Sequence, residues 1–259
     1  MPAGEATEET IHVSNGALMT PFQLTGRRIL ITGGASGIGA ATARLCAQLG
    51  ATPVIADRQD AEPVLADIAA AGGQAEALAC DVTDRAQVDR AVAAAGRIDG
   101  LVACSAICPW DDWNAPDWDD IFVRTNDVNV RGTLLCVRAV LPDMMARRDG
   151  RIVLIGSVAG QMGGLLSGPH YVASKGAINS LVKWLARRGA PHNVLVNGIA
   201  PGVTRTPMTV GQNANLAAIP MGRLATAEEI AAPIAFLLSP AASYVCGLML
   251  DVNGGTWMG

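Results

Sequence analysis

The chain has 259 residues, 50% of them hydrophobic, and a formal net charge of −4. That is enough apolar material for one domain with a sizeable core. The acidic balance excludes the basic surface of a nucleic-acid-binding protein, and no apolar run reaches the roughly 18 residues of a membrane span. The acidic start MPAGEATEET has neither the basic nor the apolar part of a secretory signal, so we expect a cytoplasmic protein.

Short apolar strands and helical patterns alternate along the chain. Residues 1–21 are polar and without period, which predicts a flexible arm before a single domain over residues 22–259. A helical pattern over 38–49 follows the first strand and stops at Gly50. Strands are predicted at residues 28–32, 53–56, 77–80, 101–104, 152–155, 194–197 and 248–251. This alternation predicts an α/β fold, a Rossmann-type doubly wound domain with a seven-stranded parallel sheet and helices on both faces.

A glycine-rich segment, TGGASGIG, lies between the first predicted strand and the first helix. Gly33, Gly37 and Gly39 permit a tight turn whose backbone N–H groups approach a pyrophosphate at the helix N-terminus. Asp57 ends the second strand, where a carboxylate accepts the ribose hydroxyls of NAD and repels the 2′-phosphate of NADP. An ordinary turn aspartate is the alternative, and the neighbouring Arg58 would suit the phosphate. We predict NAD, with NADP less favoured.

The pair Tyr171 and Lys175 stands four residues apart in YVASK, which places both side chains on one face of a helix. An ammonium beside a phenol lowers a phenol pKa that is ordinarily about 10. Such a phenol exchanges a proton with an alcohol oxygen near neutral pH. Ser157 ends a predicted strand, at the edge where doubly wound sheets bind ligands; helix capping is its alternative role. The pattern predicts alcohol–carbonyl oxidoreduction.

These motifs, with CDV at 80–82 and Pro201-Gly202, occur in an order that resembles the short-chain dehydrogenase/reductase family from about Leu24 to the C-terminus. The resemblance implies that Tyr171 is the general acid/base and that Lys175 lowers its pKa and holds the nicotinamide ribose. It implies that Ser157 binds the substrate oxygen. It also implies that Asn129, in VNVRG, holds a water of the proton relay, with Asn126 as the competing candidate.

The resemblance further implies a small-molecule substrate, a homotetramer, and neither nucleic acid nor membrane as a partner. Asp81 is expected at the adenine edge, as a helix N-cap, or both. Residues 203–225 lack a period and predict a mobile loop over the site. The implied cofactor-binding residues are Gly33, Ser36, Gly37, Ile38, Gly39, Asp57, Asp81, Val82, Tyr171, Lys175, Thr204 and Thr206.

The six cysteines are scattered and none forms CxxC, so we predict buried free thiols and no metal site. His170 has no partner spacing and is predicted to be a loop residue.

Three departures from the family pattern carry predictions. Residues 103–106 read Ala-Cys-Ser-Ala in place of NNAG, which predicts altered packing beside the adenosine ribose. Residues 118–129 are about one helical turn longer than the pattern, which predicts a bulge or a lengthened helix before Asn129. The loop after Pro201-Gly202 is short, which predicts an open substrate mouth.

A mostly apolar pocket with one polar reacting corner suits a secondary alcohol or ketone with an apolar body. An NAD-dependent alcohol dehydrogenase or carbonyl reductase is the first hypothesis. The alternatives are an NADPH-dependent 3-oxoacyl carrier reductase, which Asp57 disfavours, and a non-catalytic nucleotide-binding protein, which Ser157, Tyr171 and Lys175 disfavour. The candidate pocket residues, for which core or interface packing is the alternative, are Ile107, Trp110, Met162, Leu165, Leu166 and Met208.

Overall fold

The computed structural model describes residues 21–109, 113–164, 167–212 and 214–259. Apart from Pro21, the predicted N-terminal arm lies outside these residues. The candidate pocket residues Trp110, Leu165 and Leu166 also lie outside them.

Over the described residues the chain forms a seven-stranded sheet in the order β3-β2-β1-β4-β5-β6-β7, and every neighbouring pair is parallel. The chain moves outward in one direction from β1 to β3 and returns to begin β4 on the other side of β1, which is the topological switch point of a doubly wound sheet. The predicted fold class is therefore confirmed. The strands are β1 (Arg28–Thr32), β2 (Thr52–Asp57), β3 (Glu76–Ala79), β4 (Gly100–Ala103), β5 (Gly150–Ile155), β6 (Val194–Pro201) and β7 (Met249–Val252).

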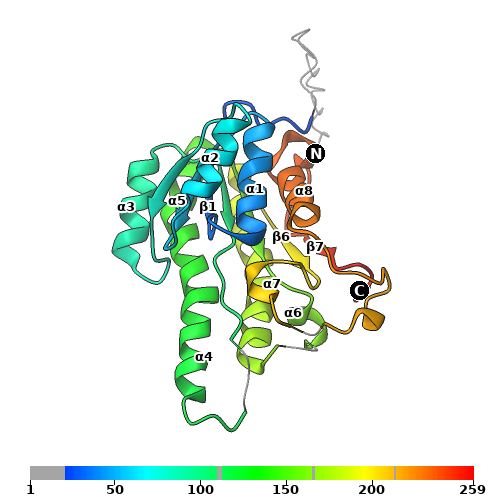
Figure 1. The fold of residues 1–259 in the computed structure, drawn as a ribbon. Coiled ribbons are helices and arrows are strands. Elements are labelled where there is room, and N and C mark those ends of the chain that lie inside the picture. Colours follow the sequence, from blue (N-terminus) through cyan, green and yellow to red (C-terminus); the bar gives the residue numbers. More distant parts are fainter. Residues whose placement is uncertain (1–20, 110–112, 165–166, 213) are drawn as a thin grey trace, which may run out of the picture.

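The central strands are buried on both faces, which is why they read as nearly continuous apolar runs. In β6, all eight residues are buried. One helical layer (α1, α2, α8) covers one face of the sheet and a second layer (α3, α5, α7) covers the other, as Figure 1 shows. The α-helices are α1 (Gly37–Gln48), α2 (Glu62–Ala70), α3 (Arg85–Ala95), α4 (Trp118–Asn126), α5 (Thr133–Arg147), α6 (Ala159–Met162), α7 (Pro169–Gly189) and α8 (Ala227–Leu238).

The long helical run of α4 and α5 is interrupted by a π-helical turn, η1 (Asp127–Gly132). Such turns mark an inserted residue in an α-helix and are frequent at functional sites. The sequence predicted a bulge or lengthened helix before Asn129. The structure has the bulge, and Asn129 lies inside it.

Short 3₁₀ helices occur in several connections. Two of them, η3 (Pro207–Thr209) and η4 (Leu216–Ala218), lie in the predicted loop over residues 203–225, and Thr204 forms an isolated bridge with Ala225. This connection therefore has more local order than its aperiodic sequence indicated. The others are η2 (Ala190–His192) and η5 (Pro240–Ala242).

Two sequence-based expectations were wrong. His170 is not a loop residue: Pro169 begins α7, as proline often does at the first helical position, and places His170 in the first turn, fully buried. Its Nε2 lies 3.2 Å from the Pro109 carbonyl oxygen. The thiols are free, but of the six only Cys46, Cys80 and Cys136 are buried; Cys104 and Cys108 are half-buried and Cys246 is exposed.

None of the helices in the described part of the chain has the length and apolar content needed to cross a membrane.

Candidate active site

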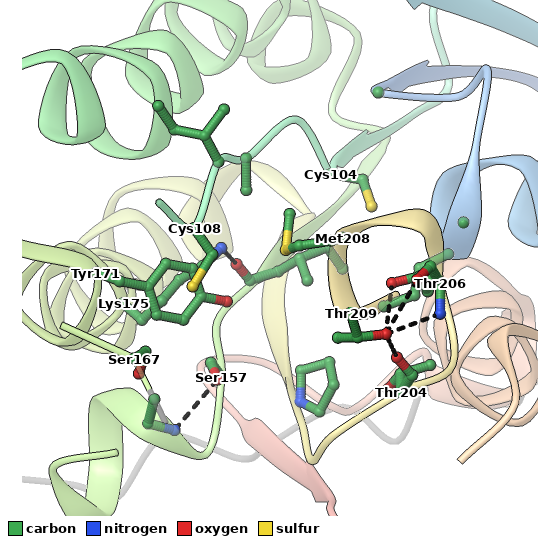
Figure 2. A pocket seen from close by; sticks show the side chains of 18 of the residues that line it. Cys104, Cys108, Ser157, Ser167, Tyr171, Lys175, Thr204, Thr206, Met208 and Thr209 are labelled. Atoms are coloured by element: carbon green, nitrogen blue, oxygen red, sulfur yellow. Dashed lines mark hydrogen bonds between the residues drawn. The ribbon is translucent and has the colours of Figure 1, made fainter. Parts of the chain in front are cut away.

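A cavity of about 400 Å³ opens at the carboxyl ends of the strands. This is the edge at which doubly wound sheets bind their ligands, next to the switch point between β1 and β4. Its lining comes from the loops that follow successive strands, and Figure 2 shows part of it. The lining includes Gly33 and residues 36–38, 57–59, 80–82, 104–108, 155–159, 201–204 and 206–209.

The glycine-rich turn forms the cavity wall after β1. Gly37 has a φ of +52°, a left-handed conformation that favours glycine, and it begins α1. Gly39 lies behind the turn rather than on the cavity, and a Cβ there would stand 2.2 Å from the Gly33 carbonyl oxygen. Ser36 is the N-cap residue of α1 and makes no side-chain cap hydrogen bond. Together with Ile38 these residues expose a helix N-terminus to the cavity, a favourable position for a phosphate.

Asp57 ends β2 at the cavity, beside the turn. Its Oδ2 accepts a hydrogen bond from the Ala35 N–H at 3.0 Å, and its Oδ1 accepts one from the Gln59 N–H at 3.0 Å. Both oxygens keep a second lone pair for further donors. Arg58 pairs with Asp81, with Nη1 3.4 Å from Oδ2, so its guanidinium is directed toward the end of β3.

Asp81 and Val82 line the cavity after β3. Asp81 accepts hydrogen bonds from the N–H and hydroxyl of Thr83. Burial raises the pKa of Asp81, but the bonds from Thr83 and Arg58 outweigh it and leave the pKa below its ordinary value. The N-cap of α3 is Asp84, not Asp81, which leaves the adenine-edge role as the prediction for Asp81.

Tyr171 and Lys175 lie one turn apart near the start of α7, and Ser157 follows β5; all three line the cavity. The Lys175 Nζ is 5.5 Å from the centre of the Tyr171 ring and donates a 2.8 Å hydrogen bond to the Ile155 carbonyl oxygen. The Ser157 Oγ accepts from the Ala159 N–H at 3.1 Å.

The protein alone does not give Tyr171 the lowered pKa that the sequence suggested. Burial raises the pKa of the phenol, Cys108 adds to this increase, and Ser157 offsets it only in part. Burial also lowers the pKa of Lys175 to about 8. The expected lowering of the Tyr171 pKa is not found because the Lys175 ammonium is directed at the Ile155 carbonyl, while burial removes the phenol from water.

Asn129 lies behind the cavity wall and not on it. Its Oδ1 accepts from the Ile107 N–H at 2.9 Å, and its Nδ2 donates to the Ile107 carbonyl at 3.0 Å and to the Ser174 Oγ at 3.0 Å. The side chain thus holds the loop after β4 against α7. The role of Asn129 toward a water of the proton relay stays a prediction. Asn126 donates only a local bond to the Phe122 carbonyl, one turn earlier in α4.

Residues 103–106, which depart from the family pattern NNAG, are held by backbone hydrogen bonds to the side chain of Thr32. The Cys104 and Ser105 N–H groups donate to the Thr32 Oγ1 at 3.1 and 3.3 Å. Burial raises the pKa of Cys104 and of Cys108 to about 11. Both thiols line the cavity, although the sequence predicted them only as buried free thiols; Cys104 is the last residue of the fourth predicted strand and Cys108 lies four residues beyond it.

Thr204 and Thr206 line the cavity from the loop after β6. Of the predicted pocket residues, Ile107, Met162 and Met208 line it as well. Several polar lining residues gave no sequence signal, because they come from aperiodic loops or from the added turn of α4; they are Arg124, Gln212, Asn215 and Thr256.

Comparisons with known proteins agree with this geometry. A family model described as enoyl-(acyl carrier protein) reductase matches residues 33–256. A cis-4-hydroxycyclohexanecarboxylate dehydrogenase from Sinomonas cyclohexanicum is 39% identical over 243 residues, which are 88% of this chain and 96% of the relative.

Solved structures share the fold closely. A putative NAD(P) dependent gluconate 5-dehydrogenase from Beutenbergia cavernae, with bound NADP at low occupancy, has a TM-score of 0.86 and 35% identity, covering 91% of this chain and 98% of the other. A 3-oxoacyl-[acyl-carrier protein] reductase from Brucella melitensis, with bound NAD, has a TM-score of 0.86 and 33% identity, covering 100% of this chain and 99% of the other.

Proposed function

Because the chain belongs to the short-chain dehydrogenase/reductase family of oxidoreductases, we propose that it transfers a hydride between NAD(H) and a secondary alcohol or ketone with an apolar body. One observation carries this proposal. The Tyr171 phenol and the Ser157 hydroxyl line the same cavity at the carboxyl ends of the strands, and Ser157 counters part of the rise in the pKa of the phenol. Two hydroxyl groups so placed hold a carbinol or carbonyl oxygen between them.

The residues of the cavity fit a dinucleotide. The glycine-rich turn and the α1 N-terminus suit the pyrophosphate, and the Asp57 carboxylate, held beside the turn by the Ala35 N–H, suits ribose hydroxyls. The related structures contain NADP in one case and NAD in the other, so our preference for NAD rests on Asp57 and on the direction of Arg58 toward Asp81. When bound, the cofactor supplies the nicotinamide carbon that takes or gives the hydride.

The chain's own residues supply the rest. Ser157 orients the substrate oxygen by a hydrogen bond, and Tyr171 takes the proton of that oxygen during oxidation or returns it during reduction. Phenolate formation is costly in a buried site, so a nearby cation is needed as the proton arrives or leaves. The Lys175 ammonium, 5.5 Å from the ring centre, is the cation placed to meet this need.

The lining also supports an apolar substrate body. Ile107, Met162 and Met208 contribute apolar surface next to the reacting corner. The 39% identical relative is named for a hydroxycyclohexanecarboxylate, which is a secondary alcohol on a compact hydrocarbon ring that also carries a carboxylate. We further propose that residues 22–259 form the dehydrogenase domain and that the protein assembles as a homotetramer.

Absorbance at 340 nm tests the proposal. Protein with NAD or NADP is mixed with cyclohexanol, cis-4-hydroxycyclohexanecarboxylate and gluconate, and NADH formation with the ring alcohols is expected. Turnover of gluconate alone contradicts the apolar substrate class. Tyr171→Phe is expected to remove nearly all turnover while NAD affinity stays within a few-fold. Tyr244→Phe is the matched control, because Tyr244 is the second of the chain's two tyrosines and is fully exposed. A wild-type rate for Tyr171→Phe refutes the assignment.

A second candidate is the NADPH-dependent reduction of 3-oxoacyl groups on a carrier. The description of the matching family model and the reductase from Brucella melitensis favour it, and Asp57 weighs against it. Oxidation of NADPH by an acetoacetyl thioester, without oxidation of NADH, would establish this alternative. Tight NAD binding without turnover of any alcohol, ketone or thioester would instead indicate a non-catalytic nucleotide-binding protein.

A further inference from the structure

The Thr209 hydroxyl is the centre of a hydrogen-bond network inside the loop after β6. Its Oγ1 lies 2.6 Å from the Thr204 carbonyl oxygen, to which it donates, and accepts from the Thr206 N–H at 3.0 Å. It also lies 3.0 Å from the Thr206 carbonyl oxygen. Figure 2 shows Thr209 between Thr204 and Thr206, with these bonds as dashed lines. One side chain thus closes a backbone turn, which we name the 204–209 loop.

The two ends of this loop are held differently. At its base, backbone bonds tie it to the segment before α8: the Arg205 N–H donates to the Ala225 carbonyl at 2.9 Å, and the Ala225 N–H donates to the Val203 carbonyl at 3.1 Å. Beyond the base, the Thr206 N–H bonds to the Thr209 hydroxyl and the Thr209 N–H returns to the Thr206 carbonyl. The capping of η3 therefore depends on the side chain of Thr209.

The loop also contacts the glycine-rich turn. A Cβ built on Gly37 would meet the Thr206 Cβ and Cγ2 at 3.3 Å, a tight approach that only a residue without a side chain leaves free of strain. Thr206, Met208 and Thr209 all line the cavity. The position of the loop therefore sets the width of the cavity between η3 and the turn at the start of α1.

We propose that Thr209 is a positioning residue whose hydroxyl holds the 204–209 loop against the glycine-rich turn and so retains the dinucleotide. The inference rests on the proposed function only in that a dinucleotide occupies this cavity. Without the hydroxyl, the Thr206 N–H and the Thr204 carbonyl lose a partner and the loop loses its closed geometry. Valine keeps the β-branched shape of threonine and removes only the hydroxyl, and serine keeps the hydroxyl.

The test measures NADH release by stopped-flow fluorescence and NADH affinity by titration for the wild type, Thr209→Val and Thr209→Ser. We expect Thr209→Val to release NADH about tenfold faster, with a matching rise in the Kd for NADH. The reason is that the variant loses binding free energy equivalent to about one hydrogen bond. Thr209→Ser is expected to stay within about twofold of the wild type. In steady state, the KM for NAD should rise in Thr209→Val while kcat is unchanged or higher, a split that general destabilisation does not produce.

Equal release rates for Thr209→Val and the wild type would overturn the inference, and so would a Thr209→Ser variant that behaves like Thr209→Val. Thermal unfolding of all three proteins gives the second measurement: a melting temperature within a few degrees, with release changed only in Thr209→Val, supports positioning. If the wild type binds neither NADH nor NADPH, both the proposed function and this inference fail. If the wild type binds NADH but Thr209→Val releases it at the wild-type rate, only the inference about the loop fails.

Discussion

Replacing Asn129 by alanine is expected to destabilise the protein by about 3 kcal/mol. The Asn129 side chain is 1% exposed and makes three hydrogen bonds, two with the Ile107 backbone and one with the Ser174 hydroxyl. Each is worth about 1 kcal/mol, and the partners stay in the protein without a replacement. For a chain of this size the loss corresponds to a melting temperature lower by about 6–12 °C.

The measurement is urea unfolding at one fixed protein concentration, because any assembly makes apparent stability depend on concentration. The five tryptophans supply the fluorescence signal. Asn126→Ala is the matched control: it removes the same side chain one helical turn earlier, where the amide makes one local bond to the Phe122 carbonyl. Its expected cost is below about 1 kcal/mol.

The two hypotheses for Asn129 give opposite patterns. If its amide only holds a water of a proton relay, Asn129→Ala would lose turnover and keep wild-type stability, and the reasoning from the hydrogen bonds would be refuted. If the amide holds Ile107 in place, stability falls first. Activity then falls because Ile107 and its neighbour Cys108 line the cavity, and the KM for substrate should change together with kcat.

Three further predictions concern Gly39, the Lys175 ammonium and the cysteine thiols. Gly39→Ala should abolish NAD binding measured by calorimetry, because the new Cβ would lie 2.2 Å from the Gly33 carbonyl oxygen; wild-type affinity would contradict this. Burial lowers the pKa of Lys175 from 10.5 to about 8, so between these values the unfolded chain binds more protons at this side chain, and the contribution of Lys175 to stability should rise with pH. The buried thiols act in the opposite direction, because burial raises their pKa, so the contribution of Lys175 is the difference between the wild type and Lys175→Met. Between pH 7 and pH 10, Lys175→Met should lose more stability in urea unfolding than the wild type does, and an equal change in both proteins would contradict this. Finally, Ellman's reagent should titrate Cys246 quickly and the buried Cys46, Cys80 and Cys136 only after unfolding; a fast reaction of any of these three would be inconsistent with their burial.

The sheet could be predicted from the sequence because its signals are local. A strand buried on both faces reads as an apolar run whatever its neighbours are, so β1 and β2 were placed within one residue of their observed bounds. The glycine-rich turn was equally visible, since a positive φ at Gly37 and the close approach at Gly39 each exclude other side chains.

The sequence predicted which residues form the site, but not their burial, their pKa values or their hydrogen-bond partners. Tyr171 and Lys175 were placed on one helix face by their spacing alone. The direction of the Lys175 ammonium toward Ile155 comes from another strand, and the burial that raises the pKa of Tyr171 comes from several loops. The same is true of Asn129, whose partner Ile107 is 22 residues away along the chain. A pKa or a hydrogen-bond direction is a tertiary property, and single-sequence spacing does not contain it.

The altered segment after β4 shows what the turn requires of its neighbour. A Cβ on Gly33 would lie 2.9 Å from the Ser105 nitrogen, so the two backbones are already at their closest approach. The Thr32 hydroxyl fixes this spacing by accepting from the N–H groups of both Cys104 and Ser105. The fold therefore constrains the distance between the two backbones, and Thr32, the last residue of β1, supplies the acceptor that holds it. Because these bonds come from backbone N–H groups, they do not depend on the side chains at residues 104 and 105, which explains how this chain keeps the geometry of the turn without the asparagine and glycine of the family pattern.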